Sequence, residues 1–528
     1  MHTYIPQVFR QLRAEYYRLA DAGIAGDALV TQMQQAYADF VAATVAPPPP
    51  PAQQQQQRTE GAWRCPTVRF GRTGLDMPVI TCGGMRQQLT WRPEAGTTLA
   101  DIPEENQKNF EAIVDRAMAL GINHFETAVG YGTSQLQFGP CLKKYGRDSF
   151  ILQTKIGPKA DAAEFRAVLE NSFTQLQVEY LDLFAFHGIN KPEMLEWTLR
   201  PGGCMEIVEE YRRAGKIRWV GFSTHAHTDL IVKCCETGRF DYVNLHYHFV
   251  GSYTASGTWQ GPLAEPRGGS MMAPSGNHAA LLAAAKQDMG VFIISPNDKG
   301  GHLWKPSRVL VDACRPHGIT PVALNALWLW SHQRSEAAVH TLVVGAARPS
   351  DFDEMVAAAK ALPRAQELLP PIEAHLRKLM LDALGQEWVD SWWQGLPGAY
   401  DTPTGVFVPH IVWLHNLVKA WGMWDFARAR YKGLEGNAKN WKADATEEAN
   451  LASMNSYVPG MPAAPGVDVS PYLDASPHKA RILEVLAEAH EWLSDAGEAV
   501  ITPQLEECGW LSSYSLQPQW PWPEKAMH

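Results

Sequence analysis

The stretch NQKNFEAIVDRAMALGINHFE, residues 106–126, places a helical period directly before a short strand pattern. Apolar residues recur at helix spacing over residues 106–120, which predicts an amphipathic helix. The run at residues 123–126 predicts a buried strand. The same alternation recurs along the chain, with further candidate strands at residues 79–82, 150–155, 181–186, 219–223, 242–246, 291–295 and 341–345, and further candidate helices at residues 162–176, 205–214 and 278–288.

Eight strand–helix units in succession are typical of an α/β fold, the (β/α)8 TIM barrel. A doubly wound open sheet is the alternative, but no GxGxxG follows the first strand. Residues 251–276 interrupt the sixth unit with Gly, Ser and Pro and no periodicity. Loops of this length are usually functional, so we interpret this one as a lid over the carboxyl-end face of the barrel.

The segments before and after the barrel show helical and linker patterns without the alternation of strands and helices. Ile5, Phe9, Leu12 and Tyr16 recur at helical spacing, and PPPPPAQQQQQ at residues 47–57 cannot pack a core. Helical periods also fill residues 372–384, 411–421 and 481–493. We therefore expect a helical N-terminal arm at 1–45, a Pro/Gln-rich linker at 46–59, the barrel at 60–362, a helical C-terminal domain at 363–500 and a tail at 501–528. The linker has a second interpretation, as a proline motif that docks another protein.

Composition limits the classes of partner. The chain has 528 residues and a formal net charge of −10, which argues against a nucleic-acid binder and an anionic-membrane binder. The eight cysteines form no CxxC pair, so neither a disulfide framework nor a zinc ribbon is expected. No apolar run reaches the roughly 18 residues of a membrane span. We expect a cytoplasmic protein, with the tryptophan-rich helical extensions as a candidate surface for a protein partner, although such aromatics more often form core.

Polar residues at the ends of apolar strands are placed for chemistry in a barrel. Here they are Glu126, Tyr131 in the following loop, Lys155 and His187. A tyrosine with an ordinary pKa of about 10 becomes a better proton donor when an ammonium stabilises its phenolate. We therefore interpret Tyr131 as a general acid tuned by Lys155 and Glu126, with His187 orienting the substrate's carbonyl oxygen.

At this point the sequence resembles the aldo-keto reductase family over about residues 67–360. The resemblance is carried by VRFGRTGLDMPVITCGGM, GINHFETAVGYG, YLDLFAFH, GKIRWVGFSTH and VVGAARPSDFDEM, in the family's order. It implies a metal-free oxidoreductase that reduces an aldehyde or ketone with NADPH. It also assigns Glu126, Tyr131, Lys155 and His187 to the family's catalytic tetrad.

The resemblance implies a set of cofactor-binding positions as well, namely Gly84, Met85, Ser223, Thr224, Asn244, Ser295, Lys299, Gly345 and Arg348. Arg348 would suit the 2′-phosphate of NADPH, since a guanidinium can chelate a phosphate. The sequence departs from the family's pattern at several places. Glu126 replaces the usual aspartate, Thr224 an asparagine, Asn244 a glutamine, Asp351 a glutamine and Met355 an asparagine. The negative charge of Asp351 would repel a 2′-phosphate if it faced one.

Two other functions stay open. His225 and His227, and again His246 and His248, form two HxH pairs, which zinc hydrolases on this fold use as ligands. The eighth strand supplies no aspartate to complete such a set, so we predict no metal. The second alternative is a cofactor-binding regulatory scaffold with little turnover.

Overall fold

The computed structural model describes residues 63–251, 277–298, 307–331, 337–398, 404–442 and 460–495, together with isolated positions (32, 272, 401–402, 444–446, 449–450 and 458). The linker, the tail and Lys299 lie outside these residues, as do the expected N-terminal arm except residue 32 and nearly all of the segment that we interpret as a lid. From Trp63 onward the chain belongs to one compact unit. Among the described helices, none combines the length and apolarity that crossing a membrane requires.

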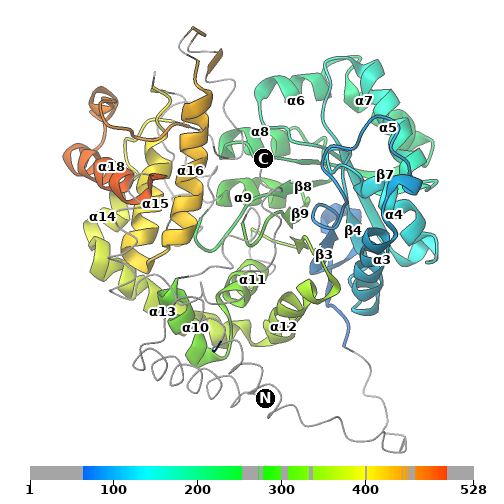
Figure 1. Ribbon diagram of the computed structural model, residues 1–528, viewed down its shortest axis with the longest axis horizontal. Helices are drawn as coiled ribbons and strands as arrows, with labels where there is room; N and C mark the ends of the chain where they lie inside the picture. The colour runs from blue at the N-terminus through cyan, green and yellow to red at the C-terminus, as the bar shows by residue number, and fades with distance from the viewer. Residues whose placement is uncertain are drawn as a thin grey trace, which may run out of the picture. The chain divides into compact units, whose positions relative to one another are not determined.

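Eight parallel strands form a closed barrel, which confirms the predicted fold class (Figure 1). The strands are β3 Ile80–Gly83, β4 His124–Glu126, β5 Ile151–Ile156, β6 Leu181–Phe186, β7 Ile217–Ser223, β8 Tyr242–Leu245, β9 Gly290–Ile293 and β10 Thr341–Val344. β10 pairs with β3 and closes the ring. Every residue of β5 and β6 is buried, as expected for parallel strands that are covered on both faces.

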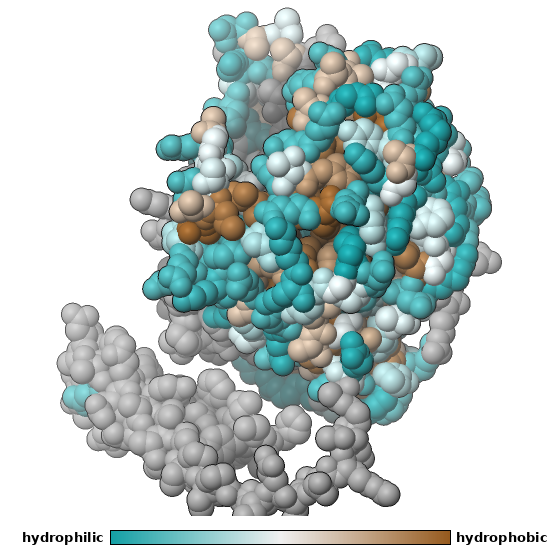
Figure 2. Space-filling view, turned by 90° about the vertical axis from the view of Figure 1, so that its right-hand side faces the viewer, coloured by the Kyte–Doolittle hydropathy of each residue, from teal (hydrophilic) through white to brown (hydrophobic). Residues whose placement is uncertain are grey.

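Helices surround the barrel because each has one apolar face. In α3, Phe110, Ile113, Val114 and Ala117 are buried at spacings of three and four residues. The helices that follow the strands are α3 Glu104–Ala119, α4 Ser134–Leu142, α5 Ala162–Leu176, α6 Pro192–Leu199, α7 Cys204–Arg213, α8 Thr228–Glu236, α9 His278–Lys286, α10 Arg308–Cys314, α11 Pro321–Ser331 and α12 Asp353–Ala361. Figure 2 views the side where α3, α4, α5 and α7 lie, and hydrophilic side chains cover most of that face.

A hairpin closes the amino end of the barrel. Its strands, β1 Thr67–Arg69 and β2 Asp76–Pro78, pair antiparallel. Between them Phe70 is fully buried, and its ring centroid lies 4.5 Å from that of Phe292 in β9. A side chain at Gly290 would collide with the Phe70 ring. The buried position of the Phe70 ring therefore requires a glycine at the start of β9.

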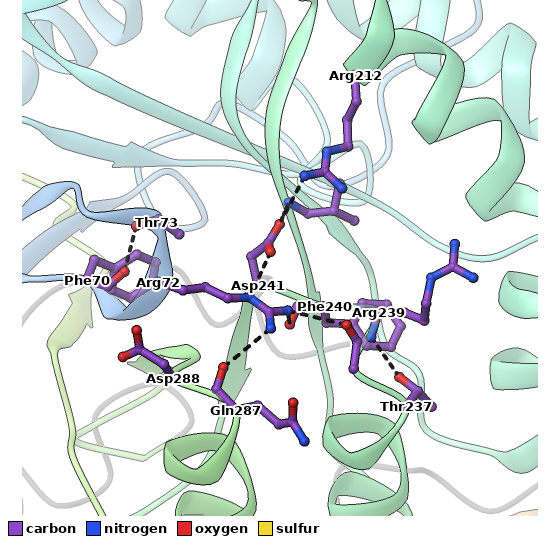
Figure 3. A network of polar contacts seen from close by, with 12 residues as sticks. Phe70, Arg72, Thr73, Arg212, Thr237, Arg239, Phe240, Asp241, Gln287 and Asp288 are labelled. Carbon is purple, nitrogen blue, oxygen red and sulfur yellow. Dashed lines mark hydrogen bonds and ion pairs between the residues drawn. The ribbon is translucent and has the colours of Figure 1, made fainter.

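Arg72 fastens this hairpin to the barrel (Figure 3). Its Nε donates to Asp241 Oδ1 at 3.0 Å, and its guanidinium also donates to the Phe240 carbonyl. Asp241 Oδ2 in turn accepts the backbone N–H of Val220 in β7 at 2.9 Å. One carboxylate thus joins the hairpin to the beginning of β8 and to the neighbouring strand.

The C-terminal helices pack together beside the barrel, on the left of Figure 1. They are α13 Ala365–Leu384, α14 Gln386–Ser391, α15 Val408–Trp421, α16 Trp424–Asn440 and α18 Lys479–Leu493. All of α15 is buried except Lys419, so it is the central helix of this group. Trp388 donates its indole N–H to Asn416 Oδ1 at 2.9 Å, and Trp421 donates to the Leu376 carbonyl at 3.1 Å. These tryptophans are core residues of the helical part.

We predict that Arg72→Ala lowers the free energy of unfolding by about 2 kcal/mol, because the nearly buried Asp241 carboxylate loses its closest cation and keeps only Arg212, 3.8 Å away. Urea denaturation followed by circular dichroism measures this change. Arg69→Ala is the control, since its ion pair with Asp288 is more than half exposed at both side chains and should leave the urea midpoint nearly unchanged. Equal midpoint shifts in the two variants would contradict the role given to Arg72.

Candidate active site

Four polar side chains meet at the carboxyl ends of neighbouring strands. Glu126 is the last residue of β4, Lys155 lies near the end of β5, and His187 directly follows β6. Tyr131 lies in the loop after β4. Parallel strands bring their carboxyl ends to one face of the barrel, and there the four predicted residues come together.

The Glu126 carboxylate and the Lys155 ammonium form an ion pair whose side chains are at most 2% exposed. Lys155 Nζ also donates to the Thr127 carbonyl at 2.9 Å. Burial lowers the pKa of Lys155 well below its ordinary value, and the paired carboxylate opposes that shift. His124, one layer deeper, has its pKa lowered to about 3, first by burial and then by the charge of Lys155. His124 is therefore neutral.

Tyr131 lies over this ion pair. Its hydroxyl donates to Glu126 Oε1 at 3.3 Å, and Lys155 Nζ lies 4.6 Å from the centre of its ring. The rings of His187 and Trp91 each meet the Tyr131 ring edge to face, with centroids 5.6 and 6.2 Å away. The phenol thus has a buried charge pair on one side and a half-exposed imidazole on another.

Backbone contacts hold Tyr131 in place by joining two loops. Gly132 has φ +56°, and a side chain there would collide with the Thr90 carbonyl. The same carbonyl accepts the Thr133 N–H at 3.2 Å, and the Thr133 hydroxyl accepts the Leu89 N–H at 3.0 Å. The loop after β3 therefore lies against the loop that carries Tyr131. Leu89 and Trp91 stay exposed there and give the mouth of the site an apolar rim.

Ser223 and Asn244 lie on neighbouring strands with their backbones in register. Asn244 is fully buried, and its Nδ2 has no hydrogen-bond partner among the described residues. Gln153 fixes the other end of that amide, because its Nε2 lies 3.3 Å from Asn244 Oδ1. The Ser223 hydroxyl accepts the Gly188 N–H at 3.1 Å and still has its own hydrogen to donate. An orphaned buried amide donor and a hydroxyl donor fit the carboxamide of a nicotinamide.

Sequence reasoning missed Gln153, although its place in ILQTK carries a signal. It stands two residues before Lys155 on the same strand, so the two side chains share a face.

Three other expected cofactor positions are already engaged in local structure. The Thr224 hydroxyl donates to the Ile189 carbonyl at 2.9 Å and accepts the Ala226 N–H at 3.0 Å. A side chain at Gly84 would lie 2.5 Å from both Phe138 and the Ser134 hydroxyl. Packing therefore accounts for this glycine. Met85 is half-buried, and its carbonyl accepts from Gln88 Nε2 at 3.1 Å.

Arg348 is paired with Asp351 at the other side of the barrel mouth. Its Nε lies 2.8 Å from Asp351 Oδ1, while Oδ2 accepts the backbone N–H groups of Ala347 and Arg348. Asp351 therefore partly neutralises the arginine that the sequence assigned to a 2′-phosphate. Gly345 is exposed next to it.

Arg86 is a second cation here that the sequence reading did not single out. Its side-chain stem lies against Gly345, where an added Cβ would be 2.8 Å from Arg86 Cγ. Burial lowers its pKa, and among the described residues no charged partner opposes that shift. The adjacent Gln87 is 2% exposed, and neither of its amide atoms has a hydrogen-bond partner among the described residues. These two side chains are suited to a polar, anionic ligand portion.

Ser295 lies just after β9 in a left-handed backbone conformation, with φ +49°. The HxH histidines make other contacts: His246 Nε2 lies 2.6 Å from His225 Nδ1, and His248 bonds to backbone carbonyls. Within the part of the chain that the structure describes, no three His, Cys, Asp or Glu side chains are grouped to hold a metal.

Comparison with known proteins gives three kinds of match. The model of the Aldo/keto reductase family matches residues 80–376. Protein tas of Escherichia coli (strain K12) is 27% identical over 23% of this chain and 44% of its own length. Aldo-keto reductase YhdN of Bacillus subtilis (strain 168) is 32% identical over 22% of this chain and 38% of its own length. The chain thus spans less than half the length of these curated relatives.

Among solved structures, an aldo-keto reductase from Klebsiella pneumoniae in complex with NADPH is 19% identical, with a TM-score of 0.42. The match covers 58% of this chain and 96% of that one. The family model, in contrast, extends over more than half of the present chain and includes every barrel strand from β3 to β10. The chain belongs to the aldo/keto reductase family.

Proposed function

We propose that this protein reduces an aldehyde or ketone with hydride from NADPH, with Tyr131 as the general acid. The contact that carries the proposal is the Tyr131 hydroxyl lying 3.3 Å from Glu126 Oε1, above the buried pair of Glu126 and Lys155. Membership in the aldo/keto reductase family supports the same reaction class. The proposed substrate is a small carbonyl compound, and the exposed apolar rim at Leu89 and Trp91 suits its hydrocarbon part.

A bound NADPH would supply hydride to the carbonyl carbon, while the protein's own residues transfer the proton. Tyr131 Oη gives its proton to the carbonyl oxygen as negative charge develops there. The Lys155 ammonium, 4.6 Å from the phenol ring centre, then stabilises the phenolate, and Glu126 keeps that ammonium charged and fixed. His187, edge-on to the phenol, directs the carbonyl oxygen toward Oη.

The residues present fit a nicotinamide coenzyme. Asn244 Nδ2 and the Ser223 hydroxyl offer donors to a carboxamide, and Gln153 holds the Asn244 amide in orientation. Arg86 and Arg348 bring positive charge to the side of the barrel where β3 pairs with β10, which suits the phosphates. Ser295 and Lys299 are further proposed coenzyme-binding residues, and Lys299 is proposed from the sequence alone.

We predict that Tyr131→Phe lowers turnover of a panel of aldehydes by roughly 10²- to 10⁴-fold, because the proton donor is gone. The dissociation constant for NADPH should stay within about twofold, since the ring and its packing remain. Oxidation of NADPH and quenching of tryptophan fluorescence measure the two quantities. Unchanged turnover would contradict the proposal, and tight NADPH binding without turnover by the native protein would favour the regulatory scaffold.

Glu126→Gln should move the alkaline limb of the turnover profile to lower pH. Burial already lowers the pKa of Lys155, and without the carboxylate the hydrogen bond to the Thr127 carbonyl is left to oppose that shift without the help of a negative charge. The ammonium is therefore lost at a lower pH than in the native protein, and turnover with it. Glu126→Asp is the matched control, because it keeps the negative charge and should keep the limb near its native position. The same limb in Glu126→Gln as in the native protein would contradict this role.

Asp351→Asn should tighten NADPH binding by roughly fivefold, the size of one exposed charge pair worth about 1 kcal/mol, without changing NADH binding. The reason is that Arg348 loses the carboxylate that now pairs with it, while the amide oxygen can still accept the Ala347 N–H. Titration of each coenzyme gives the ratio of the two dissociation constants. In an Arg348→Ala background, adding Asp351→Asn should leave the ratio of the two dissociation constants unchanged. Arg348 does not meet the 2′-phosphate if the ratio shifts in that background. The same conclusion follows if the ratio fails to shift in Asp351→Asn alone.

A further inference from the structure

The C-terminal helices contact the barrel at the loops that follow β8 and β9. Trp413 in α15 donates its indole N–H to the Val250 carbonyl at 2.9 Å. Phe249 stacks on Trp421, with ring centroids 5.6 Å apart and planes inclined by 13°. These contacts fall a few residues beyond Asn244, at the carboxyl-end face where the site lies. The helical part therefore reaches the same face of the barrel as the proposed chemistry.

One of these contacts is a buried ion pair. Arg430 in α16 pairs with Asp298 in the loop after β9, and both residues are 3% exposed. Taking two charges out of water costs several kcal/mol per ion, so a buried pair is weak evidence for a stability device. What such a pair does supply is a fixed position, because the Asp298 carboxylate alone would be strongly unfavourable in that place.

Asp298 ends a tight turn that begins at Ser295. The Asp298 N–H donates to the Ser295 carbonyl at 2.8 Å, and the two residues have φ +60° and +49°. Left-handed conformations are costly for residues other than glycine and persist only where the surroundings hold them. His248 Nε2 lies 2.7 Å from the Ser295 carbonyl, and Asn325 Nδ2 donates to the Pro296 carbonyl at 2.6 Å. Both of those residues belong to the barrel part.

We propose that Arg430 is a positioning residue for the coenzyme, which holds the Ser295–Asp298 turn in its left-handed form from the C-terminal helices. The inference rests on the proposed function, in which Ser295 is a coenzyme-binding residue. On this view the helical part completes the coenzyme site through one buried charge. Arg430 acts on the coenzyme through this turn and not by contact with the substrate or the reacting atoms.

The test uses the full-length chain and measures two quantities for each variant, the melting temperature and the dissociation constant for NADPH. Arg430→Met removes the charge and keeps the length of the stem. It should weaken NADPH binding roughly tenfold or more, within the usual range of coupling between sites, and it should also lower the melting temperature because Asp298 is left buried and unpaired. Arg430→Lys should restore most of both.

The double variant Arg430→Met with Asp298→Asn separates positioning from stability. Removing both charges relieves the unpaired carboxylate, so the melting temperature should recover while NADPH binding stays weak. Recovery of binding together with the melting temperature would overturn the inference, since a purely structural ion pair predicts that result. This variant also serves if Arg430→Met does not fold.

Glu488→Gln is the control within the helical part. It removes the negative charge that Glu488 in α18 presents to two residues of α15, His415 Nε2 at 2.7 Å and Lys419 Nζ at 3.6 Å. It should lower the melting temperature without changing the dissociation constant for NADPH. Failure of the native protein to bind NADPH or NADH would refute the proposed function itself, whereas native-like binding by Arg430→Met would refute only this inference.

Discussion

The buried pair of Glu126 and Lys155 is the constraint on which the site depends. Both side chains are nearly inaccessible to water, and burial works against the charge of the lysine. Such a pair is retained only where its geometry is fixed and its remaining hydrogen-bonding capacity is used, as the Thr127 carbonyl does for Lys155. The closed barrel supplies that fixity, because β4 and β5 are joined to each other and to neighbours on both sides. The orientation of Tyr131 then follows from the charges beneath it.

The alternation of helical and strand patterns was enough to predict the barrel, since buried parallel strands are short apolar runs between amphipathic helices. Leu181–Phe186 was predicted with the bounds that the structure has. The strand expected to begin at residue 219 begins at Ile217, because Ile217 pairs with Leu181 across β6 and β7. Strand ends depend on the partner strand, and a single sequence does not contain the register. The fit of the Phe70 ring against Gly290 is unpredictable for the same reason.

The site divides in a similar way. The types of residue at the strand ends were readable, since a lysine or histidine after an apolar run needs a partner or a task. Which hydrogen bonds each residue makes was not readable. The Thr224 hydroxyl bonds to the Ile189 carbonyl and the Ala226 N–H. Arg348 pairs with Asp351, whereas the sequence predicted only that this aspartate would repel a phosphate that it faced. Hydrogen-bond partners come from three-dimensional neighbours, so they appear only once the loops are placed.

The sequence of the C-terminal helices predicted no catalytic role. Its most visible feature is the tryptophans, and most of these are core residues. Trp388 and Trp421 satisfy their indole N–H groups within the helical part, whereas Trp413 satisfies its own on the barrel. The residue that matters at the boundary is instead a single arginine in α16. Arg430 and Asp298 are each 3% exposed and belong to different parts of the chain, so separating the parts would break this buried ion pair. A turn whose left-handed backbone requires outside support is therefore held, in part, by a segment that lies more than 100 residues further along the sequence.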